Sequence, residues 1–295
     1  MGASKRIGGQ MAAPHQTGSF RSSDVKLFYR RFGKRGGIPL AVLHGMSYFS
    51  YDWIEVAHAL GAGREVVCMD VRGFGESEWS AARDYAVPTQ ARDIANLLDH
   101  LGWKTAVLVG HSMSGRSTTF VAAKHPARVA GLALIDYSPD MAPAGGKRVT
   151  QTVAGTPDVF ASIEEAMKYF GAGAGQRARY EAYLKPVPGG FAVKRDTHFR
   201  DQFRKVLETG ERPKLGVDMW QLIGEVRCPI LSMRGARSDL YAPETVAKMK
   251  AANPRVSVVE VDAGHHIAGE NPEGFLGAMR SFLGVVEEKS HEQAA

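Results

Sequence analysis

The chain has few cysteines and no long hydrophobic run. Its 295 residues include two cysteines, Cys68 and Cys228, and each lies inside an apolar, strand-like segment. Two isolated thiols provide no disulfide framework of the kind that stabilises small secreted domains. No apolar segment approaches the roughly 18 residues that a membrane-spanning helix requires. The composition therefore predicts a cytoplasmic protein that folds around an apolar core and has no membrane partner.

Sequence motifs for metals and nucleotide cofactors are also missing. The ten histidines form no H-x₃-H or H-E-x-x-H pattern, which would place two imidazoles on one zinc ion. The segment Gly73-Phe74-Gly75 is too short for the G-x-G-x-x-G fingerprint of dinucleotide binding. We therefore expect no metal site and no cofactor.

Positive charge exceeds negative charge by six, and the excess is unevenly distributed. Residues 140–214 contain 13 Lys or Arg against 9 Asp or Glu. A basic surface can attract nucleic acid or steer anionic substrates. Here acidic residues are interspersed with the basic ones and no nucleic-acid motif accompanies them, so a solvated helical surface is the favoured interpretation. We expect a small-molecule substrate and no nucleic-acid partner, and the sequence leaves the oligomeric state open.

From about residue 38, short apolar segments alternate with segments of helical periodicity. Amphipathic patterns predict helices at 89–101, 114–124, 243–252 and 272–283. Residues 20–32 predict one or two antiparallel edge strands. The segments that predict strands buried on both faces are 38–43, 66–69, 106–109, 132–135, 230–233 and 256–261. This alternation predicts an α/β fold, with a mostly parallel sheet covered by helices on both faces.

The alternation stops in the middle of the chain, where Gly, Pro, Arg and aromatic residues are frequent. A segment of this length without a strand predicts a helical cap inserted into the α/β core. The polar chain ends predict flexible tails. The expected organisation is an N-terminal tail at 1–18, a core at 19–137 and 216–286, a cap at 138–215, and a C-terminal tail at 287–295.

Polar side chains follow the predicted strands at their carboxyl ends, which is where α/β sheets bind ligands. A serine hydroxyl becomes a good nucleophile when an imidazole accepts its proton and a carboxylate fixes the imidazole tautomer. Ser112 follows one strand, His265 another, and Asp136 and Asp239 follow two more. These residue types predict acyl-transfer chemistry with Ser112 as the nucleophile. Alone, Ser112 would equally suit a helix N-cap.

The roles of the partner residues follow from their positions. His265 is favoured as the base over His266 because it directly follows a glycine. Asp239 is favoured as the acid because it lies between a strand and a helix, while Asp136 remains the alternative acid. The backbone amides of Met46 and Met113 are the predicted oxyanion-hole donors. Candidates for the substrate pocket are His44, Tyr48, Trp53 and Tyr137.

Five segments together resemble the α/β-hydrolase-fold superfamily, in its capped serine hydrolase, esterase-like branch. The predicted triad residues occur along the chain in the order Ser, Asp, His that this family requires. The segments are His44-Gly45-Met46-Ser47 with Trp53, Asp70 to Ser77, Gly110-His111-Ser112-Met113-Ser114, Arg234 to Asp239, and Ala263-Gly264-His265 with Glu270 and Pro272. The chain departs from the pattern at Ser114, where glycine is usual, and at Ser47, where proline is usual. The resemblance implies an eight-stranded, mostly parallel sheet with an inserted helical cap.

The residues and the resemblance favour a carboxylic ester hydrolase, of the EC 3.1.1 type, acting on a small ester, lactone or thioester through an acyl-enzyme on Ser112. Serine at this position, rather than aspartate, argues against haloalkane dehalogenase and epoxide hydrolase chemistry. Three alternatives stay open. The same triad would suit a C–C bond hydrolase of a diketone or ring-fission product, or a cofactor-independent oxygenase. A ligand-binding receptor with vestigial hydrolase activity is the third. Arg116 is interpreted as a surface or ion-paired residue rather than a contact to an anionic substrate.

Overall fold

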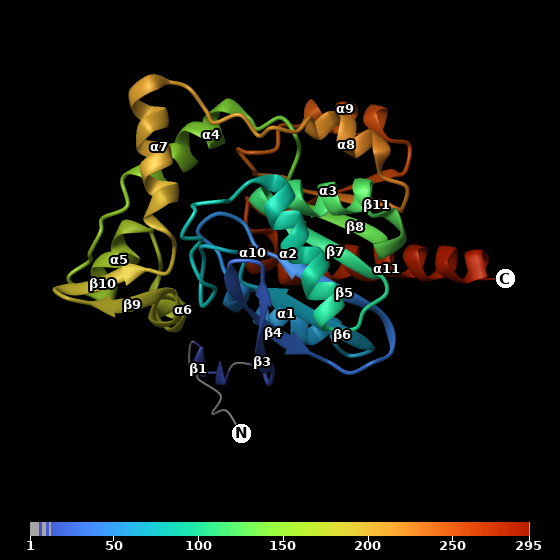
Figure 1. The fold of residues 1–295 in the computed structure, drawn as a ribbon, viewed down its shortest axis with the longest axis horizontal. Helices are drawn as coiled ribbons and strands as arrows, with labels where there is room; N and C mark the ends of the chain where they lie inside the picture. The colour runs from blue at the N-terminus through green and yellow to red at the C-terminus, as the bar shows by residue number, and fades with distance from the viewer. Residues whose placement is uncertain (1–5, 8–9, 12, 295) are drawn as a thin grey trace.

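The computed structural model describes residues 6–7, 10–11 and 13–294, and their central feature is an eight-stranded sheet with helices on both faces (Figure 1). The strand order is β12-β11-β8-β7-β5-β6-β4-β3. Strand β4 pairs antiparallel with β3 and β6, and all other neighbours in the sheet are parallel. The predicted α/β-hydrolase architecture with a mostly parallel sheet is confirmed.

All six predicted strands are present, and residues 20–32 supply the antiparallel edge. The predicted burial on both faces is wrong for 256–261, because this strand lies at the other edge of the sheet and exposes Ser257 and Glu260. The strands of the sheet are β3 (Gln16–Ser22), β4 (Val25–Phe32), β5 (Gly37–Leu43), β6 (Arg64–Met69), β7 (Ala106–His111), β8 (Val129–Ile135), β11 (Ile230–Gly235) and β12 (Val256–Val261). The helices of the core are α1 (Ile54–Leu60), α2 (Val87–His100), α3 (Gly115–Lys124), α8 (Met219–Glu225), α9 (Thr245–Ala252), α10 (Ile267–Glu270) and α11 (Pro272–Ala294). Short 3₁₀ helices are η1 (Ser50–Trp53), η2 (Ser112–Ser114), η3 (Pro126–Arg128) and η4 (Ala174–Gln176).

Alternate side chains of the central strands pack into two different apolar layers. Leu108 of β7 packs in the layer formed with α2, α3 and α8, whereas its neighbours Val107 and Val109 pack in the layer formed with α1 and α11. This is the period of two expected for an extended strand. Burial of each such aliphatic side chain contributes about 1.5–3 kcal/mol. The two layers therefore fix which side chains of each strand pack against the helices on either face of the sheet.

The segment that the sequence predicts as a cap contains more than helices. Its elements are α4 (Pro143–Ala154), α5 (Ile163–Tyr169), α6 (Arg177–Tyr183), the antiparallel hairpin of β9 (Leu184–Val187) and β10 (Gly190–Val193), and α7 (Thr197–Thr209). They lie within the predicted cap segment, but the hairpin was not predicted. An apolar cluster around Phe160, Tyr180 and Tyr183 includes Phe49 of the core. The cap thus has its own small core, which continues into the α/β domain.

Both predicted tails include regular structure. Helix α11 continues through Ala294, beyond the predicted start of a C-terminal tail at 287, because the polar residues there are good helix formers. At the other end, β1 (Arg6–Ile7) pairs with β2 (Gln10–Met11), while the predicted tail residues 1–5, 8–9 and 12 lie outside the described part of the chain. In the described part, no helix has the length and apolar character needed to cross a bilayer.

Candidate active site

Ser112 lies on a tight turn between β7 and α3. Its φ is +50°, in the left-handed region where a residue other than glycine costs about 1–3 kcal/mol. The turn packs closely, because a Cβ added to Gly110 would lie 2.3 Å from Oγ1 of Thr118. Ser112 and Met113 line a cavity of about 1680 Å³. The strained turn therefore presents the serine at the carboxyl end of the strand, facing open space.

Ser114 occupies the position where the family pattern has glycine, and its side chain has a clear structural role. It is fully buried, and its hydroxyl donates to the backbone carbonyl of His44 at 2.5 Å. This hydrogen bond joins the turn at Ser112 to the loop that follows β5. Because Ser114 does not line the cavity, it does not compete with Ser112 as a nucleophile.

The loop after β5 passes directly beside Ser112. A Cβ added to Gly45 would lie 2.9 Å from Cβ of Ser112, so only glycine allows this approach. Met46 lines the cavity, and its amide makes no hydrogen bond within the described chain. Met113 is the second residue of η2, where an N–H has no acceptor inside the helix. Both predicted oxyanion donors are therefore free and border the same cavity.

Two arginines of the cap hold this loop at Ser47. Nη2 of Arg179 donates to the Ser47 carbonyl at 3.0 Å, and Nη1 of Arg195 donates to the Ser47 hydroxyl at 2.7 Å. Ser47 has a φ of +65°, so its backbone is strained where the family pattern has proline. Arg179 also donates to both oxygens of Asp52, at 2.6 and 3.0 Å. The shape of the loop beside Met46 thus depends on the cap.

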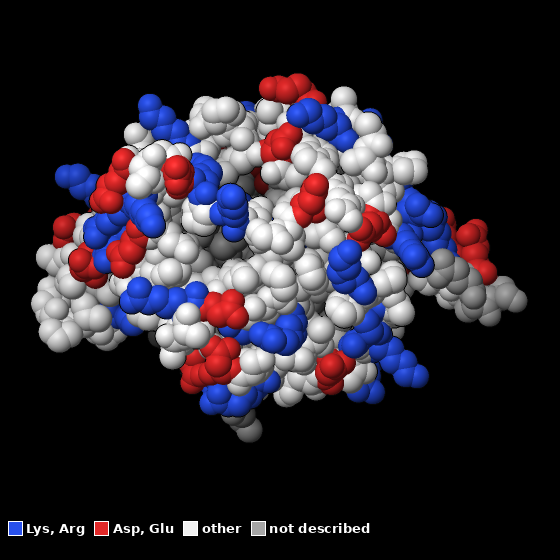
Figure 2. Space-filling model, turned by 45° about the horizontal axis from the view of Figure 1, so that its top comes forward, with Lys and Arg blue, Asp and Glu red and all other residues white. Residues whose placement is uncertain are grey.

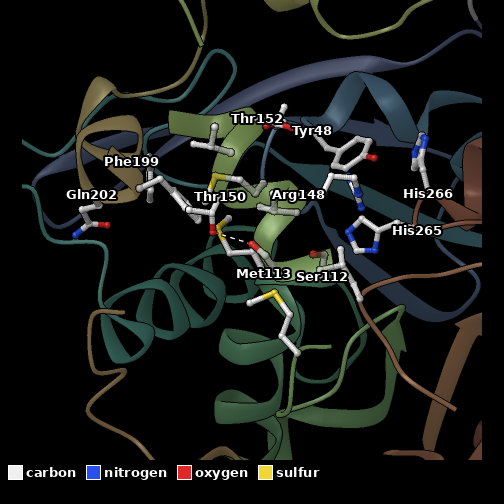
Figure 3. A pocket seen from close by; sticks show the side chains of 18 of the residues that line it. Tyr48, Ser112, Met113, Arg148, Thr150, Thr152, Phe199, Gln202, His265 and His266 are labelled. Atoms are coloured by element: carbon white, nitrogen blue, oxygen red, sulfur yellow. Dashed lines mark hydrogen bonds between the residues drawn. The ribbon is translucent and has the colours of Figure 1, made fainter. Parts of the chain in front are cut away.

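His265 follows β12 and hydrogen bonds to Asp136. Its Nδ1 lies 2.6 Å from Oδ2 of Asp136, whose carboxylate is completely buried. The backbone N–H of Gly235 donates to Oδ1 of Asp136 at 2.9 Å, and the Ser238 hydroxyl donates to Oδ2. These bonds turn the carboxylate towards His265. In Figure 3 the imidazole of His265 lies next to Ser112 on the cavity wall.

Asp239, the favoured acid in the sequence analysis, is not the partner of His265, and that prediction is wrong. Both of its carboxylate oxygens accept hydrogen bonds from Arg148 of α4, each at 2.7 Å. These hydrogen bonds lower the pKa of Asp239. Its carbonyl also accepts from Gly145 of α4 at 3.0 Å. Asp239 therefore joins the core to the cap, and the alternative residue Asp136 has the position next to His265.

His111, which precedes the nucleophile candidate, contacts both the backbone and the ring of His265, and the sequence did not single it out. Its Nε2 donates to the backbone carbonyl of His265 at 3.1 Å, and the two rings are 4.8 Å apart. Burial, with His265 and His266 nearby, holds the pKa of His111 well below its usual value. A neutral ring fits this role, because a carbonyl needs only the one N–H. Residue 111 is the first variable position of the G-x-S-x-G pattern, so the pattern does not predict a contact between His111 and His265.

Of the four predicted pocket residues, only Tyr48 lines the cavity (Figure 3). His44 is fully buried, with Nδ1 donating to the Gly45 carbonyl at 2.9 Å and Nε2 accepting from the Val71 amide at 3.0 Å. Trp53 and Tyr137 are buried in the two apolar layers of the core. These three predictions are wrong, because the side chains face the sheet and its helices rather than the cap.

The cavity lies between the cap and the carboxyl ends of the strands. Thr150 and Thr152 of α4 and Phe199 and Gln202 of α7 line it from the cap (Figure 3). The face shown in Figure 2 is hollowed, with Lys and Arg side chains beside the hollow. No group of three or more His, Cys, Asp or Glu residues is arranged to hold a metal in the part of the chain that the structure describes. The geometry suits an organic ligand of moderate size.

Comparison with known proteins places these features in a family. Residues 38–272 match the family model described as the alpha/beta hydrolase fold. The chain is 33% identical over 262 residues to a 3-hydroxybutyrate-oligomer hydrolase of Cupriavidus necator, covering 83% of this chain and 88% of the relative. It is 26% identical over 274 residues to a 2-(acetamidomethylene)succinate hydrolase of Mesorhizobium japonicum, covering 89% and 94%. A crystal structure of E-2-(acetamidomethylene)succinate hydrolase matches with a TM-score of 0.79 at 24% identity, covering 92% of this chain and 99% of that one.

Proposed function

The chain belongs to the α/β-hydrolase-fold family, and we propose that it is a serine hydrolase that cleaves a small carboxylic ester through an acyl-enzyme on Ser112. The observation that carries the proposal is the hydrogen bond of 2.6 Å between Asp136 and His265, on the same cavity as the strained Ser112. A buried carboxylate bound to Nδ1 of an imidazole leaves Nε2 free to accept a proton.

In the first half of the reaction, Ser112 Oγ attacks the ester carbonyl carbon while Nε2 of His265 takes the hydroxyl proton. The carbonyl oxygen becomes an oxyanion and accepts hydrogen bonds from the amides of Met46 and Met113. Each such donor typically contributes about 10²–10³ in rate. When the tetrahedral intermediate collapses, the bond to the alcohol oxygen breaks and His265 returns the proton to the departing alcohol. The acyl group stays on Ser112.

In the second half, water repeats these steps on the acyl-enzyme. His265 takes a proton from water, the hydroxide oxygen bonds to the acyl carbon, and the same two amides hold the oxyanion. The Ser112 oxygen then leaves and recovers its proton from His265. Throughout, Asp136 stabilises the imidazolium and fixes the ring orientation without itself taking a proton.

The named relatives support this class of substrate. One is named for hydrolysing oligomers of 3-hydroxybutyrate, and hydroxy acids joined through their hydroxyl and carboxyl groups form esters. The other is named for hydrolysing a succinate derivative. Small esters of carboxylic and hydroxycarboxylic acids are therefore the first compounds to test.

The experiment compares the turnover of 4-nitrophenyl butyrate by the wild type and by Ser112→Ala. We expect kcat to fall by about 10⁴ or more, because the nucleophile is lost. Ser117→Ala is the matched control, since Ser117 is a buried serine of α3 that does not line the cavity, and it should stay within about threefold of the wild type. Wild-type activity that survives in Ser112→Ala would overturn the proposal.

A further inference from the structure

Arg116 lies in the first turn of α3, four residues after Ser112, and lines the same cavity. Its side chain is partly buried. Within the described residues, its guanidinium takes part in no hydrogen bond and no ion pair, and it lines the cavity, unlike the surface or ion-paired residue expected from the sequence. An arginine that is withdrawn from water is normally matched by a carboxylate, and here none is present.

Three other cations around the cavity have their charge or their N–H groups engaged. Arg148 is paired with Asp239 and Arg179 with Asp52. Arg212 donates to the Gly146 carbonyl and to the Thr150 hydroxyl, each at 3.0 Å. The remaining cations of the cavity, Arg83, Lys147 and Lys214, are exposed to water. Arg116 therefore differs from these neighbours in having neither a protein partner nor full hydration.

The surroundings of Arg116 add to this imbalance. Burial lowers its pKa, and the positive charge of Arg212 lowers it further. Tyr137 packs on the start of α3, where a Cβ added to Gly115 would lie 2.3 Å from its Cγ. The hydroxyl of Tyr137 is buried without a hydrogen-bond partner. Tyr137 itself does not line the cavity, so the imbalance at this end of the cavity wall is the positive charge of Arg116 and Arg212, which an anion would satisfy.

We propose that Arg116 binds a free carboxylate of the substrate, so that the preferred substrates are small esters carrying a second, unesterified carboxyl group. A planar guanidinium binds a carboxylate through two parallel N–H···O hydrogen bonds. A single arginine matches the one negative charge of a carboxylate better than the double charge of a phosphate. This assignment rests on the proposed function, because it names the substrate class of the same cavity.

The position of Arg116 also limits the length of the substrate. Arg116 and Ser112 lie on the adjoining elements α3 and η2 and line the same cavity, so the proposal places the bound carboxylate only a few bonds from the carbonyl that Ser112 attacks. Half-esters of short dicarboxylic acids have this spacing. Long-chain esters without a charge do not use Arg116.

The first test uses a matched pair of esters, mono-4-nitrophenyl glutarate and its methyl-capped form, with release of 4-nitrophenolate as the signal. The wild type should prefer the free carboxylate by about tenfold or more in kcat/KM, and Arg116→Met should remove this preference while changing the capped ester less than about threefold. Arg116→Lys should keep part of the preference. Lys147→Met, which removes an exposed cation from the same cavity, should leave it in place.

The second test separates this assignment from the hydrolase proposal. Binding of monomethyl glutarate and of dimethyl glutarate to Ser112→Ala is measured by calorimetry, which requires no turnover. We expect binding of the half-ester only, and its loss in Ser112→Ala/Arg116→Met. If that pattern holds while no ester is hydrolysed, the carboxylate site stands and the hydrolase proposal fails. The opposite result has two parts: the wild type hydrolyses the free and the capped 4-nitrophenyl glutarate esters equally well, and Ser112→Ala/Arg116→Met binds monomethyl glutarate as well as Ser112→Ala does. That result would refute the carboxylate site and leave the hydrolase proposal standing.

A thermal unfolding measurement checks that the substitution acts locally. Removing a guanidinium without a partner should leave Tm unchanged or raise it, as is common for residues kept for binding rather than stability. A clear fall in the Tm of Arg116→Met would show that the arginine stabilises the fold, which contradicts the assignment.

Discussion

The floor and the roof of the cavity are held by different kinds of contact. The floor includes Ser112 and His265, with Asp136 buried behind His265, at the carboxyl ends of β7, β12 and β8. Asp136 is fixed there by a backbone N–H and by a left-handed backbone with φ of +45°. The roof is the cap, and long side chains join it to the core, such as Arg179 to Asp52.

This difference predicts which properties respond to substitution in each region. Backbone hydrogen bonds at strand ends have one geometry that the sheet imposes, so changes in the floor should reduce kcat. Ion pairs of flexible side chains depend on how well each pair is shielded from water. Changes in the roof should therefore affect stability according to burial, and reduce kcat only where they reach the loop at Ser47.

The largest contrast is expected between the two aspartates. Asp136→Asn should lower kcat by about 10²–10⁴, because the amide no longer stabilises the imidazolium of His265. Asp239→Asn should change kcat less than about fivefold, since its partner is Arg148. Both are measured on 4-nitrophenyl butyrate. The reverse order of losses would show that Asp239 serves His265 during turnover.

The next contrast lies within the roof. Arg179→Met leaves the carboxylate of Asp52, which is 3% exposed, without its partner, so the free energy of unfolding should fall by about 3–5 kcal/mol. Arg148→Met breaks an exposed pair and should cost about 1 kcal/mol or less. Urea unfolding measures both. Equal losses would contradict the distinction between buried and exposed pairs.

A smaller effect is expected where the floor meets the loop of the oxyanion donors. Ser114→Ala leaves the buried carbonyl of His44 without the hydroxyl that donates to it, which should cost about 1–3 kcal/mol of stability and reduce kcat several-fold by loosening Met46. Ser281→Ala, on the exposed face of α11, should change neither. Unchanged kcat in Ser114→Ala would show that the loop keeps its position without this bond.

The smallest effect concerns pH. The pKa of His111 is lowered in the folded state, so below about pH 6.5 the unfolded chain binds a proton that the folded chain refuses, and stability falls on acidification by up to about 1.4 kcal/mol per pH unit. His111→Gln keeps an N–H for the His265 carbonyl but removes this titration. Its unfolding free energy should therefore decline less than that of the wild type between pH 7 and 5.5. Parallel declines would indicate that His111 titrates normally.

Much of the fold was predictable because strands buried on both faces have a distinctive sequence. The run at 106–109 is apolar at every position, as both layers of the core require. His265 lies four residues beyond the end of β12 and was predicted from the glycine that precedes it. The position of Ser112 was predictable from the strand before it. A polar residue directly after such a strand lies at the sheet edge where ligands bind.

The acid could not be chosen from the sequence because both candidates satisfy that rule. Asp136 and Asp239 each follow a strand, and the choice depends on Arg148, which comes from a cap helix far along the chain. The contact of Ser114 with His44 joins two loops that are 70 residues apart. The sequence also could not predict that Arg116 lacks a partner. Whether a carboxylate lies beside it depends on how the cap and the core pack together.

Labelling with a fluorophosphonate, followed by peptide mapping, tests the reactivity of Ser112 most directly. The account predicts one adduct, on Ser112, formed quickly by the wild type and by Asp239→Asn, slowly by Asp136→Asn, and not at all by Ser112→Ala. An adduct on another serine, or esterase activity that persists while Ser112 remains unlabelled, would contradict it.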